Sequence, residues 1–363
     1  MAVSPQGVWI MLEFDRRNYG PLKPEDVAVP ASVPTSARET YVRNFLEATC
    51  ATGRLSMFAM DQYFEHLFVD FYQQGHDDTS IKHLFDIAIR SHVGAIAVQL
   101  GPLVRMAGID PAYGQVPTIV KVTSKTNYRG NAEPYSAVLD TVEAVLAARE
   151  RGLNIVGVGT TVYPGSEHEE RMYSETRAII REAHAAGLLA VVWCYPRGAA
   201  VVEKAKQWLE EEGVEVPEKF GFREAEKHPK TVLAAAAVLT VLSPDFGKIN
   251  PPDPKKLGLA PADDEAANEV ALGEAVKMAS PVRIICAGGS KQAPEAFLAQ
   301  LKRQIDIAGV MGNATGRNIH ERPLEEAVRM ADAIASITVA NATVEEAMAV
   351  LNGESPFPEK PLR

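Results

Sequence analysis

After Gly53 the chain repeats one pattern: a short apolar run, a polar loop, and a segment whose apolar residues follow helical spacing. Eight of the apolar runs have the length of β-strands and show little alternation between apolar and polar positions. The predicted strands span residues 57–61, 93–100, 117–123, 154–162, 188–195, 242–249, 282–288 and 309–316. Such uniformly apolar strands are expected when helices cover one side of a parallel sheet and packed side chains cover the other.

The segments between these strands carry helical patterns. Residues 137–151 and 294–308 each place their apolar residues on one stripe, and Gly152 and Gly309 follow where a C-terminal cap would lie. The repeated order of strand, helix, glycine and strand is typical of a parallel α/β sheet. Eight such units predict an α/β protein with a closed (β/α)8 TIM barrel.

The chain divides into three predicted parts. Residues 1–52 are expected to form an N-terminal extension, because four prolines between Pro21 and Pro34 interrupt any long element there. Residues 53–340 form the barrel domain, and residues 341–363 form a C-terminal tail.

Two connections are longer than a minimal strand-to-helix unit. Residues 196–241 and 250–281 flank the sixth strand, and we expect extra helices in both, with helical patterns at 204–213 and 232–239. Insertions of this kind usually lie over the active-site end of a barrel.

Charge and cysteine content narrow the class of protein. The net charge of −10 argues against nucleic acid or an anionic membrane as the main partner, since both require a basic surface. Three separate cysteines without a CxxC pair indicate reduced thiols. The first twelve residues lack the pattern of a signal peptide, and no stretch reaches the ~20 apolar residues of a membrane helix. We expect a cytoplasmic protein.

In a barrel of this kind, catalytic residues lie where the strands end. The predicted strand ends carry Asp61, Lys121, Tyr163, Trp193, Tyr195, Lys248, Gly288, Gly289, Gly316 and Arg317. The eight histidines are scattered, and only His66 closely follows a strand end, so we expect no metal site. Gly157 and Gly159 lie inside a strand and lack the third glycine of a dinucleotide motif, so we expect no cofactor.

Two lysines are candidates for the same chemistry. Burial lowers the pKa of a lysine, and the neutral amine attacks a ketone to give an imine that draws electrons from a neighbouring C–C bond. Lys248 stands in an otherwise apolar strand, and Lys121 ends another. Either could instead be paired with a buried carboxylate or extend to solvent. The residues alone do not choose between them.

The remaining strand ends provide acid–base and anion-binding groups. Tyr195 is a candidate proton donor and acceptor, although a core tyrosine would look the same. Asp61 is a candidate for contact with substrate, or a structural ion-pair partner. The glycine pair at 288–289 and the Gly316-Arg317 pair follow strands seven and eight, the usual phosphate site of such barrels. The alternative is that these residues form only two tight turns and a surface arginine and bind no phosphate.

Taken together, these motifs resemble the archaeal-type (DhnA-type) class I fructose-bisphosphate aldolases. The resemblance runs from Gly53 to Ile337 with gaps. It includes Gly53-Arg-Leu, Asp61-Gln with Glu65-His66, Ile119-Val-Lys121, Thr161-Val-Tyr163-Pro-Gly165, Trp193-Cys-Tyr195, Gly247-Lys248, Gly288-Gly289 and Gly316-Arg317.

The resemblance implies a role for each residue. Lys248 corresponds to the lysine that forms the Schiff base, and Tyr195 to the proton-transfer tyrosine. With Lys248 as the nucleophile, we expect Lys121 and Asp61 to orient substrate hydroxyls and to keep Lys248 reactive. Asp61 corresponds to an aspartate that contacts substrate hydroxyls. Trp193, Gly288, Gly289, Gly316, Arg317 and His66 correspond to substrate-binding positions. The family also implies metal independence, a phosphorylated ketose substrate, a place in glycolysis and gluconeogenesis, and a homo-oligomer.

Three positions depart from the family pattern. Tyr63 replaces a glycine after strand one, and we expect it to narrow the mouth of the site. Ala287 replaces a serine before the double glycine, which removes a hydroxyl from the phosphate site. Gly247 replaces a valine before the reactive lysine.

The function implied is reversible cleavage of fructose 1,6-bisphosphate into dihydroxyacetone phosphate and glyceraldehyde 3-phosphate. The departures leave open an alternative, a Schiff-base aldolase or transaldolase-like enzyme for another phosphorylated ketose or deoxy sugar. Two hypotheses for functions of other classes stay open. One is a metal-free isomerase with Asp61 or Glu65 as its base, and the other is a barrel that binds a sugar phosphate or a partner protein without catalysis.

Overall fold

The computed structural model describes residues 21–66, 71, 79–130 and 132–358. Its centre is a closed barrel of eight strands in the order β1-β10-β9-β8-β7-β6-β3-β2, with every neighbouring pair parallel. The strands are β1 (Leu55–Ala59), β2 (Ala95–Val98), β3 (Thr118–Lys121), β6 (Ile155–Val162), β7 (Leu189–Cys194), β8 (Phe246–Ile249), β9 (Arg283–Ala287) and β10 (Gly312–Thr315). The predicted (β/α)8 barrel is confirmed.

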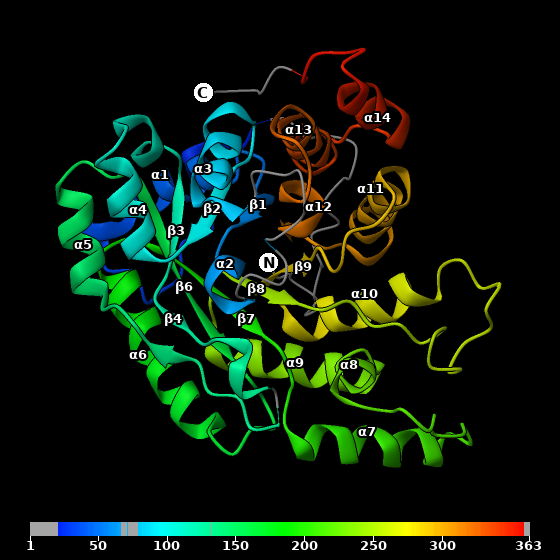
Figure 1. Cartoon of the computed structure of the whole chain (residues 1–363). Coiled ribbons are helices and arrows are strands. Elements are labelled where there is room, and N and C mark those ends of the chain that lie inside the picture. The colour runs from blue at the N-terminus through cyan, green and yellow to red at the C-terminus, as the bar shows by residue number, and fades with distance from the viewer. Residues whose placement is uncertain (1–20, 67–70, 72–78, 131, 359–363) are drawn as a thin grey trace, which may run out of the picture.

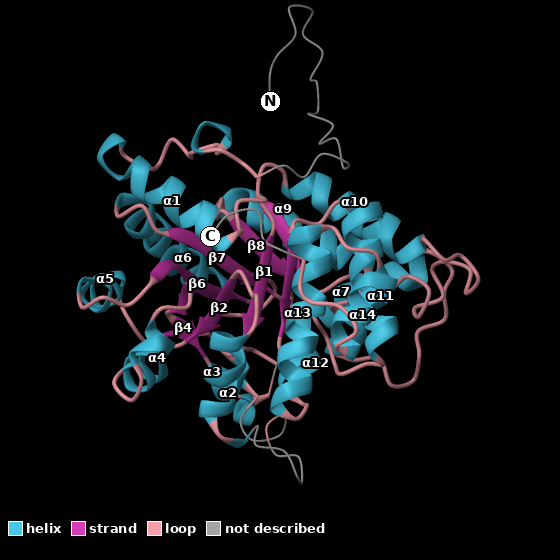
Figure 2. Ribbon diagram, turned by 90° about the horizontal axis from the view of Figure 1, so that it is seen from above, coloured by secondary structure: helices cyan, strands magenta, loops and turns pink. Residues whose placement is uncertain are grey.

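A ring of helices surrounds the strands (Figures 1 and 2). Its main members are α3 (Ile81–Arg90), α4 (Leu100–Ala107), α5 (Val142–Glu150), α6 (Glu169–Ala185), α9 (Pro229–Leu242), α10 (Ala267–Ala279), α11 (Pro294–Arg303) and α13 (Leu324–Ala340). The apolar stripes of these helices cover the strands, and the apolar residues between them form one continuous core.

Three element boundaries differ from the predictions for local reasons. The first strand is 55–59 rather than 57–61, because Asp61 has helical backbone angles and precedes α2 (Gln62–Glu65). The sixth strand begins at Phe246, because α9 continues to Leu242 and ends at Ser243 in a left-handed conformation. Helix α5 starts at Val142, because the Thr141 side chain accepts a hydrogen bond from the Ala144 N–H and caps it. The residues before α5 include β5 (Ala137–Val138), which pairs with β4 (Thr123–Ser124).

The N-terminal extension contains a helix, α1 (Arg38–Ala48), which packs into the barrel core. Its side chains Tyr41 and Phe45 are fully buried, and the Phe45 ring stacks on Phe246 with centroids 6.0 Å apart. The Asn44 side chain donates a hydrogen bond of 2.7 Å to the carbonyl of Gly187. Phe246 and Gly187 mark the beginnings of β8 and β7, so α1 covers the amino-terminal end of the barrel. The division of the chain at 52/53 stays a prediction.

The two long connections differ in content. The first contains α7 (Ala199–Glu211) and α8 (Phe222–Ala225) before α9, so extra helices are confirmed there. The expectation is wrong for the second, where residues 250–266 are a proline-rich loop and only α10 follows. Both insertions share a small apolar cluster in which Leu209 of α7 and Leu257 of the loop are buried. They form one wall beside the barrel, seen around α7 and α8 in Figure 1.

The C-terminal tail also contains a helix, α14 (Val344–Asn352), which packs on α13 and α11. Its residues Ala347 and Leu351 belong to the main core. Throughout the described part of the chain, every helix is too short or too polar to cross a membrane.

Candidate active site

A cavity of about 1020 Å³ opens where the carboxyl ends of the barrel strands meet. We call it the central cavity. Nine of the ten predicted site residues line it: Asp61, His66, Trp193, Tyr195, Lys248, Gly288, Gly289, Gly316 and Arg317. The tenth, Lys121, lies behind the cavity wall. The barrel therefore brings together residues that are up to 256 positions apart in the chain (61 to 317).

Lys248 points from β8 into the central cavity with only 3% of its surface exposed. Burial is the main reason that its pKa falls to about 8, and the positive charges of Lys121 and Arg317 lower it further against the opposing charges of Asp61 and Glu65. A usable fraction of the amine is therefore neutral near neutral pH. The Lys248 Nζ lies 5.3 Å from the centre of the Trp193 ring.

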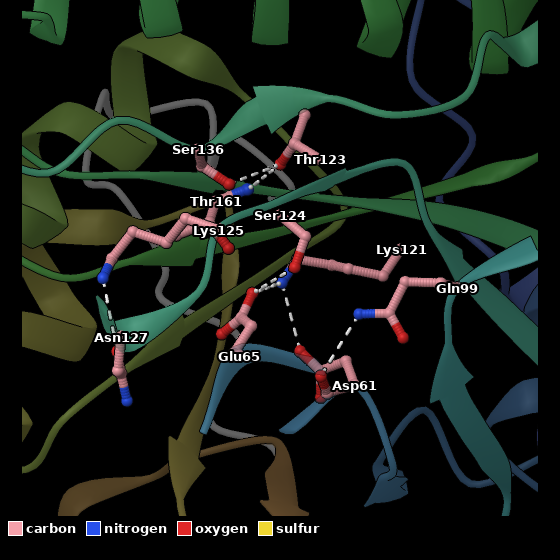
Figure 3. A network of polar contacts seen from close by, with 10 residues as sticks. All are labelled: Asp61, Glu65, Gln99, Lys121, Thr123, Ser124, Lys125, Asn127, Ser136 and Thr161. Atoms are coloured by element: carbon pink, nitrogen blue, oxygen red, sulfur yellow. Dashed lines mark hydrogen bonds and ion pairs between the residues drawn. The ribbon is translucent and has the colours of Figure 1, made fainter. Parts of the chain in front are cut away.

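Lys121 has the opposite electrostatic character (Figure 3). Its Nζ donates hydrogen bonds to Glu65 Oε1 at 2.8 Å and to Asp61 Oδ2 at 3.1 Å. Burial alone would lower its pKa, but the charges of Glu65 and Asp61 outweigh burial and raise it. Lys121 therefore stays protonated, and a protonated amine cannot attack a carbonyl. The geometry favours Lys248 as the nucleophile, a choice that the residues alone left open.

Asp61 offers an acceptor to the cavity. One carboxylate oxygen, Oδ2, accepts from Lys121, whereas Oδ1 is buried without a hydrogen-bond partner among the described residues. Burial raises the pKa of this carboxyl, but the charges of Lys121 and Lys248 outweigh burial and lower it. The side chain of Gln99 donates to the Asp61 backbone carbonyl at 3.2 Å and holds the turn in place. Asp61 is thus ionised and can accept a hydrogen bond from a substrate hydroxyl.

Trp193 lies near the end of β7, and Tyr195 is the first residue after this strand. The indole Nε1 of Trp193 is buried without a hydrogen-bond partner among the described residues, so it can donate to a bound molecule. A Cβ at Gly159 would lie 2.5 Å from the Trp193 ring, so this glycine makes room for the indole. Burial raises the pKa of Tyr195 well above its usual value, which keeps its phenol protonated as a donor.

The loops after β9 and β10 form a glycine-lined corner. Gly289 has a φ of +67°, a backbone conformation that strains other residues, and a Cβ at Gly316 would lie 2.0 Å from Gln62 Oε1 and 3.0 Å from the Ala59 carbonyl oxygen. The Asn318 amide donates to the carbonyls of Gly288 at 2.9 Å and Ser290 at 3.1 Å. It therefore ties the two loops together. Asn318 immediately follows the predicted site residue Arg317 in the sequence. Its role in connecting the two loops could not be predicted, because it depends on contacts with a loop that is distant in the sequence.

The opposite wall of the cavity contains residues that sequence reasoning did not assign to the site. Arg197 Nε lies 3.1 Å from Glu226 Oε2, and its guanidinium lies 5.1 Å from the Tyr195 ring and 5.5 Å from the Tyr163 ring. Glu226 belongs to the first insertion, so no strand-end rule could have found it. Arg197 lies three residues after the end of the fifth barrel strand, β7. This position close to a strand end could have identified Arg197 as a candidate site residue from the sequence.

The departures at Tyr63 and Gly247 have packing explanations. The Tyr63 hydroxyl donates to the Thr79 carbonyl at 2.8 Å, and its ring packs on Phe71, so the side chain lies outside the cavity lining. The expectation that Tyr63 narrows the mouth is wrong. A Cβ at Gly247 would lie 2.5 Å from a methyl of Leu239 on α9, so the glycine leaves room for the Leu239 side chain against β8.

An α/β barrel with a buried lysine of lowered pKa in its cavity defines an enzyme suited to imine chemistry on a carbonyl substrate. The chain belongs to the DeoC/LacD family of aldolases, whose family model matches residues 55–322. In the described part of the chain, no three His, Cys, Asp or Glu side chains form a group that could hold a metal ion.

Named relatives agree with this membership. A Methanocaldococcus jannaschii protein named fructose-bisphosphate aldolase/6-deoxy-5-ketofructose 1-phosphate synthase is 40% identical over 336 residues, covering 92% of this chain and 97% of the relative. The structure of a fructose-bisphosphate aldolase from Slackia heliotrinireducens is 42% identical, with a TM-score of 0.82 and coverage of 94% and 98% of the two chains. An archaeal fructose-1,6-bisphosphate aldolase, solved with its catalytic lysine covalently bound to the carbinolamine intermediate, is 27% identical with a TM-score of 0.62, covering 83% and 98%.

Proposed function

We propose that this protein is a class I aldolase that reversibly cleaves fructose 1,6-bisphosphate into dihydroxyacetone phosphate and glyceraldehyde 3-phosphate. The observation that carries the proposal is the position of Lys248 in the central cavity with a pKa lowered to about 8, whereas the pKa of the neighbouring Lys121 is raised. We infer the substrate, fructose 1,6-bisphosphate, from the names of the relatives.

The reaction begins at Lys248. Its neutral amine attacks the C2 ketone to give a carbinolamine, and loss of water gives an iminium ion. Tyr195, which is protonated, donates the proton that lets the hydroxyl leave as water. The Asp61 Oδ1 accepts a hydrogen bond from a substrate hydroxyl and so orients the sugar chain.

Bond cleavage uses the iminium ion as an electron sink. A base removes the proton of the C4 hydroxyl, the C3–C4 bond breaks, and its electron pair moves toward the iminium nitrogen to leave an enamine. We assign this base to the Tyr195 phenolate formed in the previous step. The aldehyde departs, the enamine takes a proton at C3, and water releases dihydroxyacetone phosphate from Lys248.

The C1 phosphate is assigned to the glycine-lined corner. Gly288, Gly289 and Gly316 let backbone groups approach an anion closely, and Arg317 adds a positive charge to the cavity. His66 lines the same cavity next to α2 and is proposed as a further substrate contact.

Reductive trapping tests the proposal. Borohydride added with dihydroxyacetone phosphate should reduce the imine to a stable secondary amine, and mass spectrometry of peptides should place the added mass on Lys248. The Lys248→Met protein should be neither trapped nor active, whereas a Lys219→Met control, altered at an exposed lysine of the first insertion, should behave as wild type. Trapping or turnover that survives Lys248→Met would refute the assignment.

A second candidate function follows from the name of the Methanocaldococcus jannaschii relative. Dividing 6-deoxy-5-ketofructose 1-phosphate at its C3–C4 bond gives dihydroxyacetone phosphate and methylglyoxal, so the same enamine would attack a different aldehyde. Supplying both aldehydes to the enzyme with dihydroxyacetone phosphate, and measuring each product, separates the two activities. Preference for methylglyoxal would favour the second.

We further propose a cytoplasmic enzyme of glycolysis and gluconeogenesis that works as a homo-oligomer. The proposed domain organisation is an extension over 1–52, a barrel over 53–340 and a tail over 341–363. Size-exclusion chromatography with light scattering would give the oligomeric state directly.

A further inference from the structure

A buried histidine and a buried aspartate lie at the amino-terminal end of the barrel, the end opposite the central cavity. His184 is in the last turn of α6, and Asp245 directly precedes β8. Both side chains are 1% exposed, and His184 Nε2 lies 3.1 Å from Asp245 Oδ2. The other ring nitrogen, Nδ1, lies 2.7 Å from the hydroxyl oxygen of Ser32, an exposed residue of the segment before α1. Ser32, His184 and Asp245 are thus connected in the order of a catalytic triad, and we call them the basal triad.

The hydrogen bonds to Asp245 decide which nitrogen of a neutral His184 carries the proton. The Ala190 N–H donates to Asp245 Oδ2 at 2.7 Å, and the Tyr41 hydroxyl donates to Oδ1. Burial and the charge of Asp245 raise the pKa of Tyr41, which keeps this phenol protonated as a donor. Because Asp245 acts as the acceptor, the imidazole donates to it from Nε2. The lone pair of Nδ1 then faces the Ser32 hydroxyl, as the role of general base requires.

The chain around Ser32 holds its hydroxyl in place and leaves the residue open to solvent. Ser32 lies between Pro30 and Pro34, whose rings restrict the backbone. The Val33 N–H donates to the Pro30 carbonyl at 3.0 Å and closes a turn, while the Val33 side chain is buried in the main core. An accessible and preorganised hydroxyl with a base at 2.7 Å meets the geometric requirement for a nucleophile.

We propose that the basal triad is a second catalytic site, which hydrolyses small uncharged esters through an acyl intermediate on Ser32. Residues 28–34 carry no charged side chain, and this favours an uncharged ester over an ionic one. The site acts independently of the proposed aldol cleavage, because the central cavity opens at the other end of the barrel.

The reaction has two steps. The Ser32 Oγ attacks the ester carbonyl while His184 Nδ1 takes its proton, and the bond to the leaving oxygen breaks as that proton passes to the departing alcohol. Water then gives a proton to the same Nδ1 and attacks the acyl carbon, which releases the acid and returns the proton to Ser32. Asp245 is a positioning residue that keeps the imidazole in the required orientation.

A fluorophosphonate probe tests the nucleophile. The Ser32 oxygen should displace fluoride from phosphorus, and mass spectrometry of peptides should place the adduct on Ser32. Ser32→Ala should lower the labelling rate by at least about 100-fold, and His184→Gln should lower it by roughly the same factor. Ser36→Ala alters another exposed serine of the same segment, so this matched control should be labelled like wild type.

Turnover of p-nitrophenyl acetate tests the hydrolysis. The measurement uses a Lys248→Met background, because the neutral Lys248 amine would also react with the ester. Release of p-nitrophenolate should continue over many turnovers and should fall at least about tenfold with Ser32→Ala but not with Ser36→Ala. Asp245→Asn should lower kcat while KM stays within about twofold, a result that separates a positioning role from a purely structural one.

Labelling that misses Ser32, or that is equal at Ser32 and Ser36, would overturn the basal triad and leave Ser32 as a tether for the N-terminal extension. Ester turnover that survives Ser32→Ala would overturn it as well. Both serine variants change only exposed side chains, so the test stands even where His184→Gln does not fold. Cleavage of fructose 1,6-bisphosphate by protein that retains Lys248 should be unchanged in both serine variants, so failure of the basal triad and failure of the proposed function are distinguishable.

Discussion

Lys121 and Lys248 have the same side chain and almost the same burial, yet their pKa values move in opposite directions. Two carboxylates lie within hydrogen-bond distance of Lys121, at 2.8 and 3.1 Å, whereas Lys248 has no carboxylate that close among the described residues. Direct ion pairing outweighs burial in the first case, and burial prevails in the second. In the proposed mechanism, Lys121 therefore provides a fixed positive charge and Lys248 provides the nucleophile.

The pH dependence of imine formation should follow Lys248. Because its pKa is lowered to about 8, the protonated form prevails below that pH, and the neutral amine accumulates as the pH rises through it. We expect kcat/KM for cleavage to rise about tenfold per pH unit below pH 8 and to level off above it. Steady-state kinetics across this range would measure the midpoint. A midpoint near the usual lysine value of about 10.4 would contradict the assignment.

Replacing Lys121 should alter both stability and this midpoint. Lys121→Met leaves Asp61 and Glu65 as close carboxylates without their cation, so we expect the free energy of unfolding to fall by about 3–5 kcal/mol. The remaining negative charges should also move the Lys248 midpoint to higher pH. Urea denaturation gives the first quantity, and the rate of borohydride trapping against pH gives the second. An unchanged midpoint would show that Lys121 does not tune Lys248.

At the scale of elements, α1 is the clearest difference between the predicted and observed organisation. The prolines of the first fifty residues predicted an extension without a long element, and they do precede α1. The helix itself starts at Arg38 and buries Tyr41 and Phe45 against the start of the barrel strands. The Tyr41 hydroxyl donates to the buried Asp245, which also accepts from the Ala190 N–H at 2.7 Å.

Phe45→Ala should therefore lower the free energy of unfolding by about 3–5 kcal/mol, as for other aromatic residues truncated in a core. Val42→Ala, on the half-buried outer side of the same helix, is the matched control and should cost far less. Chemical denaturation of both variants measures the difference. Similar costs would mean that α1 is an appendage and not part of the core.

The two insertions contribute to the wall of the central cavity and are not part of the eight-stranded barrel. Helices α7 and α8 and the loop 250–266 share their own apolar cluster, and the first insertion supplies Glu226 to the pair with Arg197. Sequence patterns located both insertions and the α7 helix. They could not predict the loop in place of a helix after β8, or the packing of one insertion on the other, because both depend on contacts across about fifty residues of chain.

At the scale of the whole molecule, the proposed mechanism uses the iminium ion formed on Lys248 as the electron sink for bond cleavage. Catalysis should therefore survive removal of divalent metal. We expect kcat and KM for fructose 1,6-bisphosphate to be unchanged after dialysis against excess EDTA, measured beside a metal-replete sample. Loss of activity with chelator, restored by a divalent ion, would point to metal-assisted enolate chemistry instead.

The sequence by itself determined the barrel and the ordinal place of each strand end. Uniform apolar runs and capping glycines are local features, and parallel strands bring their carboxyl ends to one face whatever the details of packing. Nine of the ten predicted site residues therefore line one cavity. The same rule could not place Glu226, nor show that Tyr63 turns away toward Phe71.

Only the tertiary structure distinguished the two candidate lysines, by lowering the pKa of Lys248 and raising that of Lys121. The pKa of Lys248 depends on burial inside the barrel and on charges at residues 61, 65, 121 and 317, which the chain brings together from opposite ends. Electrostatic energies depend on distance in space, and sequence separation does not measure that distance.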